Sequence, residues 1–168
     1  YDKIHLFDVQ VSEGENYRES ASILAGDLGA ATVDTPLGRM GLTVCYDVRF
    51  PELYRALGAA GAEALLVPAA FTLTTGKEHW EPLLRARAIE NECYVLAAAQ
   101  TGRHNEKRDT NGHAMIVDPW GTVVAQCHDG TGIAVADVDL DFLRQVRGRI
   151  PVWHHRRKDV YAVDPVRC

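Results

Sequence analysis

Short apolar runs alternate with amphipathic stretches along this chain, a pattern typical of an α/β layer architecture. Three of the runs, at residues 40–45, 64–68 and 94–100, are apolar nearly throughout. Strands that are buried on both faces have this composition. We therefore predict that these three runs form the central strands of the sheet.

Helical periodicity appears between and after these runs. Residues 51–60 are predicted to form a helix with Leu53 and Leu57 on one face. A second helix is predicted from about residue 79 to residue 91. Its inward side chains are expected to be Leu84, Ala88 and Ile89.

The last third of the chain predicts a hairpin, a strand and a helix. Residues 113–118 and 122–126 flank a Pro- and Gly-containing segment that is typical of a hairpin turn. A further strand is predicted at 133–137. Asp139 is a suitable N-cap for a helix that runs to about Arg149 and ends before Pro151.

The first third is different, because residues 8–35 are polar and rich in Gly and Ser. No strand or helix is predicted there beyond residues 4–7. A sheet made only of the later strands would have exposed edges and one poorly covered face. Since the chain also begins with Tyr1 rather than Met, we expect residues 1–168 to be the C-terminal part of a single domain.

Composition narrows the class of protein. The 168 residues, 46% of them hydrophobic, are enough for one domain with a real core. The net charge of −5 gives no basic surface for nucleic acid, and no apolar stretch is long enough to span a membrane. The four cysteines are widely spaced and form no CxxC pair, so we expect neither a zinc site nor a disulfide framework, and a reducing compartment.

Cys45 is the candidate nucleophile because it lies where a strand gives way to a helix, a position that presents a side chain to a cleft. Pro51 suits the first position of that helix, and Arg49 lies nearby, so the pKa of the thiol is expected to be depressed. The alternative is a small buried hydrophobic residue. A cysteine protease would need a histidine base, but the spacing selects neither His79 nor His113.

Four segments carry a resemblance to a known family, KIHLFD, GLTVCYDVRFPEL, PAAFTLTTGKEHWEPLLRARAIEN and GHAMIVDPWG, and a fifth, AAAQTGRHNEKR, narrows it to the Nit amidases. In this order and spacing they resemble the amidase branch of the nitrilase superfamily of carbon–nitrogen hydrolases. The resemblance covers almost the whole chain. It implies an α/β fold that is part of a four-layer α-β-β-α sandwich, with the N-terminal strands and helices of that sandwich missing.

The resemblance also implies roles for individual residues. Cys45 is the nucleophile, Lys3 is the general acid or oxyanion stabiliser, and Glu19 matches a second glutamate of the family. The backbone N–H of Tyr46 would be another oxyanion donor. The family's principal glutamate base precedes the lysine motif, so this chain alone is expected to be inactive.

Substrate binding is implied in the same way for Arg49, Phe71 and Thr75, which would hold the acidic end of the substrate. A guanidinium can hold both oxygens of a carboxylate. From the residues alone, Arg49 could equally form an ion pair with Asp47 or Glu52, and Phe71 could be a core aromatic.

The implied activity is a hydrolysis without metal or cofactor that releases ammonia from a small acidic amide, above all deaminated glutathione, through a thioester. The alternatives are an ω-amidase acting on ketoglutaramate, a true nitrilase, and a non-catalytic truncated isoform. The resemblance further implies a cytoplasmic homo-oligomer, with mitochondria as a second location and a Fhit domain as a fusion partner. Trp153, His154 and His155 could pack on a neighbouring subunit or on their own domain.

Overall fold

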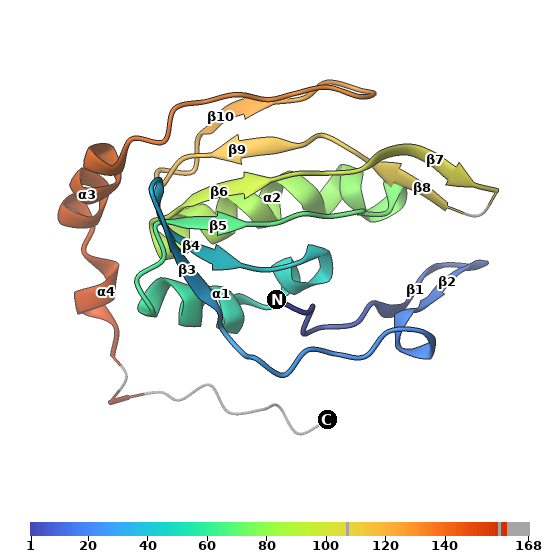
Figure 1. The fold of residues 1–168 in the computed structure, drawn as a ribbon, viewed down its shortest axis with the longest axis horizontal. Helices are drawn as coiled ribbons and strands as arrows, with labels where there is room; N and C mark the ends of the chain where they lie inside the picture. Colours follow the sequence, from blue (N-terminus) through green and yellow to red (C-terminus); the bar gives the residue numbers. More distant parts are fainter. Residues whose placement is uncertain (107, 158, 161–168) are drawn as a thin grey trace.

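The computed structural model describes residues 1–106, 108–157 and 159–160, and a six-stranded mixed sheet lies at its centre (Figure 1). The order of the strands is β10-β9-β6-β5-β4-β3, with β4, β5 and β6 parallel and the outer strands antiparallel. The strands are β3 (Thr32–Thr35), β4 (Gly38–Leu42), β5 (Ala64–Leu66), β6 (Tyr94–Ala97), β9 (Met115–Val117) and β10 (Val123–Gln126).

The three apolar runs form the parallel centre of this sheet, which confirms their prediction as central strands. The strands are shorter than the runs. Since β4 ends at Leu42, Cys45 lies outside the strand and begins the 3-10 helix η2 (Cys45–Arg49). Helix α1 (Pro51–Ala59) follows directly and confirms the predicted helix, with Leu53 and Leu57 buried.

Helix α2 (Leu73–Asn91) begins six residues before its predicted start, because the Thr72 side chain caps it by accepting from the backbone N–H of Thr75. Leu84 and Ala88 are buried as predicted, but Ile89 is 51% exposed, so its inward placement was wrong. The buried face of α2 follows the spacing Trp80, Leu84, Ala88, Asn91, and position 89 is rotated about 100° away from position 88.

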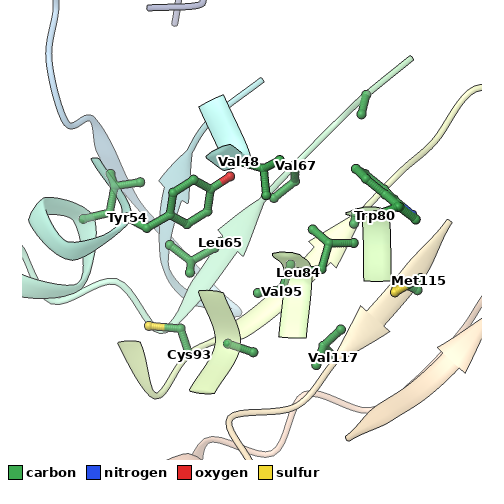
Figure 2. Close-up of a cluster of buried hydrophobic side chains, with 14 of the residues drawn as sticks. Val48, Tyr54, Leu65, Val67, Trp80, Leu84, Cys93, Val95, Met115 and Val117 are labelled. Carbon is green, nitrogen blue, oxygen red and sulfur yellow. The ribbon is translucent and has the colours of Figure 1, made fainter. Parts of the chain in front are cut away.

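Helices α1 and α2 cover one face of the sheet, and the main core lies between these helices and the sheet (Figure 1). Figure 2 shows Tyr54, Leu84 and the strand residues Leu65 and Val95 gathered in this core. The other face is covered at one end, where Leu143 of α3 (Leu140–Arg149) packs on Ala64 and Tyr94. The remaining side chains of that face are only half-buried, as the sequence led us to expect: Met40, Leu42, Leu66, Leu96 and Ile116.

The last third of the chain matches the predictions in part. The β9–β10 hairpin is confirmed, and its turn is closed by the Gly121 N–H donating to the Asp118 carbonyl at 2.9 Å. Asp139 caps α3 as expected. The strand predicted at 133–137 is absent, because this segment pairs with no other strand and its Ile133 and Val135 are 89% and 81% exposed.

Strand β3, which lies within residues 8–35 and pairs with β4, was missed. Two complete hairpins were missed as well, and both lie beyond the same end of the central sheet (Figure 1). The expectation of no structure over 8–35 was wrong, because β1 (Asp8–Ser12) pairs with β2 (Glu15–Arg18) and the 3-10 helix η1 (Glu19–Ala21) follows. The strand suggested at 4–7 is a bent, irregular segment. The second hairpin pairs β7 (Thr101–Asn105) with β8 (Arg108–Asn111).

The short helix α4 (Val152–His155) returns the chain to its own α1. The Arg55 guanidinium lies 5.0 Å from the centre of the Trp153 ring, and this ring leaves no room for a Cβ atom at Gly58. The aromatic residue of the tail therefore covers its own domain, and assembly into oligomers stays a prediction. Among the described residues, no helix combines the length and apolar character needed to cross a membrane.

Candidate active site

A cavity of about 780 Å³ opens at the carboxyl ends of the parallel strands β4, β5 and β6. In open α/β sheets, this edge is where ligands bind. The loops after β5 and β6 form one wall, while η2, the N-terminal segment and the two hairpins form the others. Lining residues include Lys3, Phe7, Tyr17, Arg18, Glu19, Cys45, Tyr46, Ala70, Phe71, Thr75, Gln100 and Arg108.

Cys45 faces this cavity from the first position of η2. Its φ of 50° lies in the left-handed region, which is uncommon for residues other than glycine and is often found at functional sites. Its backbone N–H donates to the Pro68 carbonyl at 2.9 Å, so the strained residue is fixed to the loop after β5. The thiol is thus held where a bound molecule can reach it.

Lys3 and Glu19 form an ion pair in the wall of the same cavity. Their side chains are 11% and 22% exposed, and Glu19 also accepts from the Phe7 backbone N–H at 2.6 Å. The Lys3 ammonium lies 5.9 Å from the centre of the Tyr46 ring. The four residues expected to carry the chemistry, Cys45, Lys3, Glu19 and Tyr46, therefore surround one cavity.

A buried carboxylate fixes the lysine segment to the nucleophile helix. Asp47 is fully buried and accepts from the Tyr1 hydroxyl at 2.9 Å, from the His5 backbone N–H at 3.0 Å and from the Val44 backbone N–H at 2.9 Å. The His5 ring also stacks on Phe50, with centroids 3.6 Å apart. Residues 1–5 thereby dock on η2 and bring Lys3 to the cavity.

The expectation of a depressed thiol pKa was wrong. Burial raises the pKa of Cys45, and this effect outweighs a hydrogen bond with the Ala70 backbone and the positive charges of Lys3 and Arg108, which lower it. The Glu19 charge acts in the same direction as burial. Because Glu19 is paired with Lys3, the ammonium is largely compensated at the sulfur, and the thiol is protonated at neutral pH.

Of the three side chains expected to bind substrate, two line the cavity and the third, Arg49, does not. Phe71 and Thr75 line the cavity, and Phe71 also packs on Trp80, so its ring belongs to the core as well as to the cavity wall. Their binding of a substrate stays a prediction. Arg49 is not among the lining residues. Its guanidinium lies 5.1 Å from the Phe71 ring centre and donates to Nδ1 of His79 at 3.2 Å. It forms no ion pair with Asp47 or Glu52 in the described part of the chain.

The arrangement does not support a cysteine–histidine pair. In the described residues no histidine lines the cavity. His79 accepts from Arg49, while His113 lies beside the Asn111 carbonyl at 2.9 Å and the Asp129 carboxylate at 3.3 Å. Both candidate histidines have partners away from the thiol.

Sequence reasoning missed Arg18, Arg108 and Ala70. Arg18 ends the overlooked hairpin β1–β2, and Ala70 acts through its backbone, for which the side chain gives no signal. Arg108 ends the stretch AAAQTGRHNEKR, which was used for the resemblance without assigning a site residue within it. Glu19 is the single carboxylate among the described lining residues.

Comparison with known proteins identifies this architecture. Residues 1–148 match the carbon–nitrogen hydrolase family. The chain is 56% identical to human deaminated glutathione amidase over 162 residues, which is 96% of this chain and 50% of that protein. It therefore spans about half the length of the curated relatives it matches.

Solved structures of carbon–nitrogen hydrolases are also similar to this chain. The Caenorhabditis elegans NitFhit protein superposes with a TM-score of 0.91 at 53% identity, covering 96% of this chain and 39% of that one. An amidase from Nesterenkonia sp. AN1, which carries acrylamide on its active-site cysteine, superposes with a TM-score of 0.70 at 30% identity over 91% of this chain and 57% of that one. The mixed α/β fold matches structures of the nitrilase superfamily.

Proposed function

This chain belongs to the carbon–nitrogen hydrolase family, and from that premise we propose that it supplies the nucleophile of an amidase acting on a small acidic amide. The observation that carries this proposal is the meeting of Cys45 with the Lys3–Glu19 pair around one cavity. Deaminated glutathione is the proposed substrate, because relatives with 53–56% identity include enzymes named for it and a fusion protein with a Nit half.

Acylation begins when the Cys45 sulfur attacks the amide carbonyl carbon. Negative charge then grows on the carbonyl oxygen, where the Lys3 ammonium and the Tyr46 backbone N–H are the proposed donors. The first N–H groups of a helix have no acceptor within that helix, and Tyr46 is the second residue of η2. As the C–N bond breaks, the proton that a base has taken from the thiol goes to the leaving amine, and the acyl group stays on sulfur as a thioester.

In deacylation, water becomes the nucleophile and the Cys45 sulfur becomes the leaving group. A water molecule attacks the thioester carbonyl, its proton is taken by a base, and the carboxylate product leaves as the thiol is restored. The leaving group depends on the substrate: a primary amide such as ketoglutaramate releases ammonia, whereas deaminated glutathione, a secondary amide, releases an amine. The release of ammonia expected from the sequence therefore fits the ω-amidase alternative rather than this substrate.

The 168-residue chain by itself is proposed to be inactive. Its thiol pKa is raised, so the reaction needs a base to take the thiol proton. Glu19, the one carboxylate among the described lining residues, is already engaged by Lys3 and by the Phe7 N–H. The Glu19 oxygen that makes both contacts is thus not free to take the thiol proton.

A chimaera tests the function directly. This chain replaces the matching half of human deaminated glutathione amidase, to which it is 56% identical over 162 residues. We expect the chimaera to hydrolyse deaminated glutathione, with kcat lowered at least about a thousandfold by Cys45→Ser. The 168-residue chain alone is expected to give no turnover.

The controls are the unmodified human enzyme and ketoglutaramate as competing substrate. A folded chimaera without Cys45-dependent hydrolysis would sink the amidase proposal, and turnover by the isolated chain would refute its inactivity. A higher kcat/KM for ketoglutaramate would favour the ω-amidase. The Fhit domain as a fusion partner stays a prediction, supported by the relative in which Nit and Fhit are fused.

A further inference from the structure

Among the described residues, three cationic side chains line the cavity, although the chain as a whole carries a net charge of −5. Lys3 is compensated by Glu19, which leaves the guanidinium groups of Arg18 and Arg108. The rest of the lining is largely apolar, including Phe7, Phe71 and the alanines that follow β5 and β6. A concave, apolar site with an excess of positive charge concentrates anions.

Arg108 is the better placed of the two arginines. It begins β8 on the β7–β8 hairpin and lines the cavity. Burial raises the pKa of the Cys45 thiol and of the Tyr17 hydroxyl, and the Arg108 charge opposes this rise at both groups. Since Tyr17 belongs to the opposite hairpin, the guanidinium lies within electrostatic range of both walls and of the nucleophile. Among the described residues, Arg108 has no ion pair and no hydrogen bond that would use up its donors.

Arg18 reaches the cavity from the other hairpin. It ends β2 next to Glu19, and its strand partner is Asp8 on β1. The Arg18 charge lowers the pKa of Asp8, so this arginine is partly compensated by a carboxylate outside the cavity. Its contribution to an anion site should be smaller than that of Arg108.

We propose that Arg108, assisted by Arg18, binds the carboxylate of an anionic amide whose reacting carbonyl lies at Cys45. The proposal rests on the amidase function above and names the part of the site that selects the charge of the substrate. The β1–β2 and β7–β8 hairpins, which are separate from the central sheet, thus provide the residues that select an anionic substrate. The edge of the central sheet provides the nucleophile. Arg49 does not line the cavity in the described part of the chain, and its guanidinium lies 5.1 Å from the centre of the Phe71 ring, so it is not assigned to this anion site.

The test uses thiol reagents, so that it does not depend on amide turnover. The probes are 4-maleimidobutanoate and its primary amide, which have the same length and differ in charge. The second-order rate constant for modification of Cys45 is measured for each by mass spectrometry of the Cys45 peptide. Their ratio cancels changes in thiol pKa and in access to the cavity, since these affect both reagents alike.

Arg108→Gln is expected to lower the ratio of carboxylate to amide rate about fivefold, and Arg18→Gln about twofold. Arg108→Lys should keep at least half of the wild-type ratio. The matched control is Arg103→Gln on the same hairpin, because Arg103 donates to the Asn105 carbonyl at 3.2 Å and does not line the cavity. This control should leave the ratio unchanged.

An unchanged ratio in Arg108→Gln would overturn the proposal, as would an equal fall in Arg103→Gln, which would indicate a diffuse field rather than a site. The amidase function fails separately. An inactive chimaera with the expected ratios would leave the anion site standing, whereas an active chimaera with an unchanged ratio would remove only the anion site.

Discussion

His5 contacts the buried carboxylate of Asp47 twice, with its backbone N–H at 3.0 Å and its ring Nδ1 at 2.8 Å from the same oxygen, Oδ1. This contact joins the segment that carries Lys3 to the helix that begins with the nucleophile. Two residues that are 42 positions apart in sequence are thereby in contact, which places Lys3 beside the same cavity as Cys45.

Asp47→Asn should break this connection. One carboxylate oxygen becomes an amide NH₂ group, which cannot accept from the donors that surround it, and the side chain is fully buried. We expect the free energy of unfolding in urea to fall by about 2–4 kcal/mol. The control is Asp34→Asn, because Asp34 is exposed and, within the part of the chain that the structure describes, its ion pair is with Arg39; this variant should not differ measurably from the wild type. Equal stability of Asp47→Asn and wild type would contradict the anchoring role.

The parallel centre of the sheet could be predicted because its strands are continuous apolar runs, a composition typical of strands buried on both faces, although one face is only half-buried in this chain. The β1–β2 hairpin was harder to predict. Residues 8–12 do alternate between exposed and half-buried positions, and Gly14, with φ of 87°, closes a two-residue turn before β2. That alternation was a usable signal. The segment 133–137 shows the reverse error, since it alternates but has no partner strand.

The pKa of the thiol and the charge balance of the site could not be predicted from the sequence. A position next to a helix start suggested a reactive thiolate, but burial is a property of the assembled cavity and it raises the pKa of Cys45. The pairing of Lys3 with Glu19, 16 residues apart, likewise depends on how β1 and β2 fold back. Sequence could name these residues by resemblance, but not the balance of their charges.

Glu19→Gln should make the thiol more reactive, because it leaves the Lys3 ammonium uncompensated in the cavity. The thiolate form is then favoured, and the rate of Cys45 alkylation by iodoacetamide near pH 7 should rise about threefold or more. Lys3→Gln should change the rate in the opposite direction. The pH dependence of the Cys45 alkylation rate measures both effects. If the two variants shifted this dependence in the same direction, the pair would not control the thiol.

Arg49→Lys distinguishes a contact with substrate from a role in the cavity wall. The planar guanidinium stacks on Phe71, and an ammonium cannot replace that contact. We expect similar slowing, by roughly two- to threefold, for the charged and the neutral maleimide reagents. Direct binding of the substrate carboxylate by Arg49 would instead slow the charged reagent alone. The same two rate constants therefore decide between the role implied by the family resemblance and the one suggested by its position.

Cys93 should make the stability of the protein depend on pH in the alkaline range. Its thiol is fully buried and donates towards the carbonyls of Ala62 and Asn91, and burial raises its pKa to about 11. Because the folded state holds this proton more tightly than the unfolded state, the stabilisation is complete below the ordinary thiol value near 9 and is lost as the pH rises towards 11. The loss should reach roughly 2–3 kcal/mol. Urea unfolding of wild type and Cys93→Ala across this range isolates the effect, since the other titrating groups are common to both. Parallel stability curves for the two proteins would show that the thiol keeps an ordinary pKa.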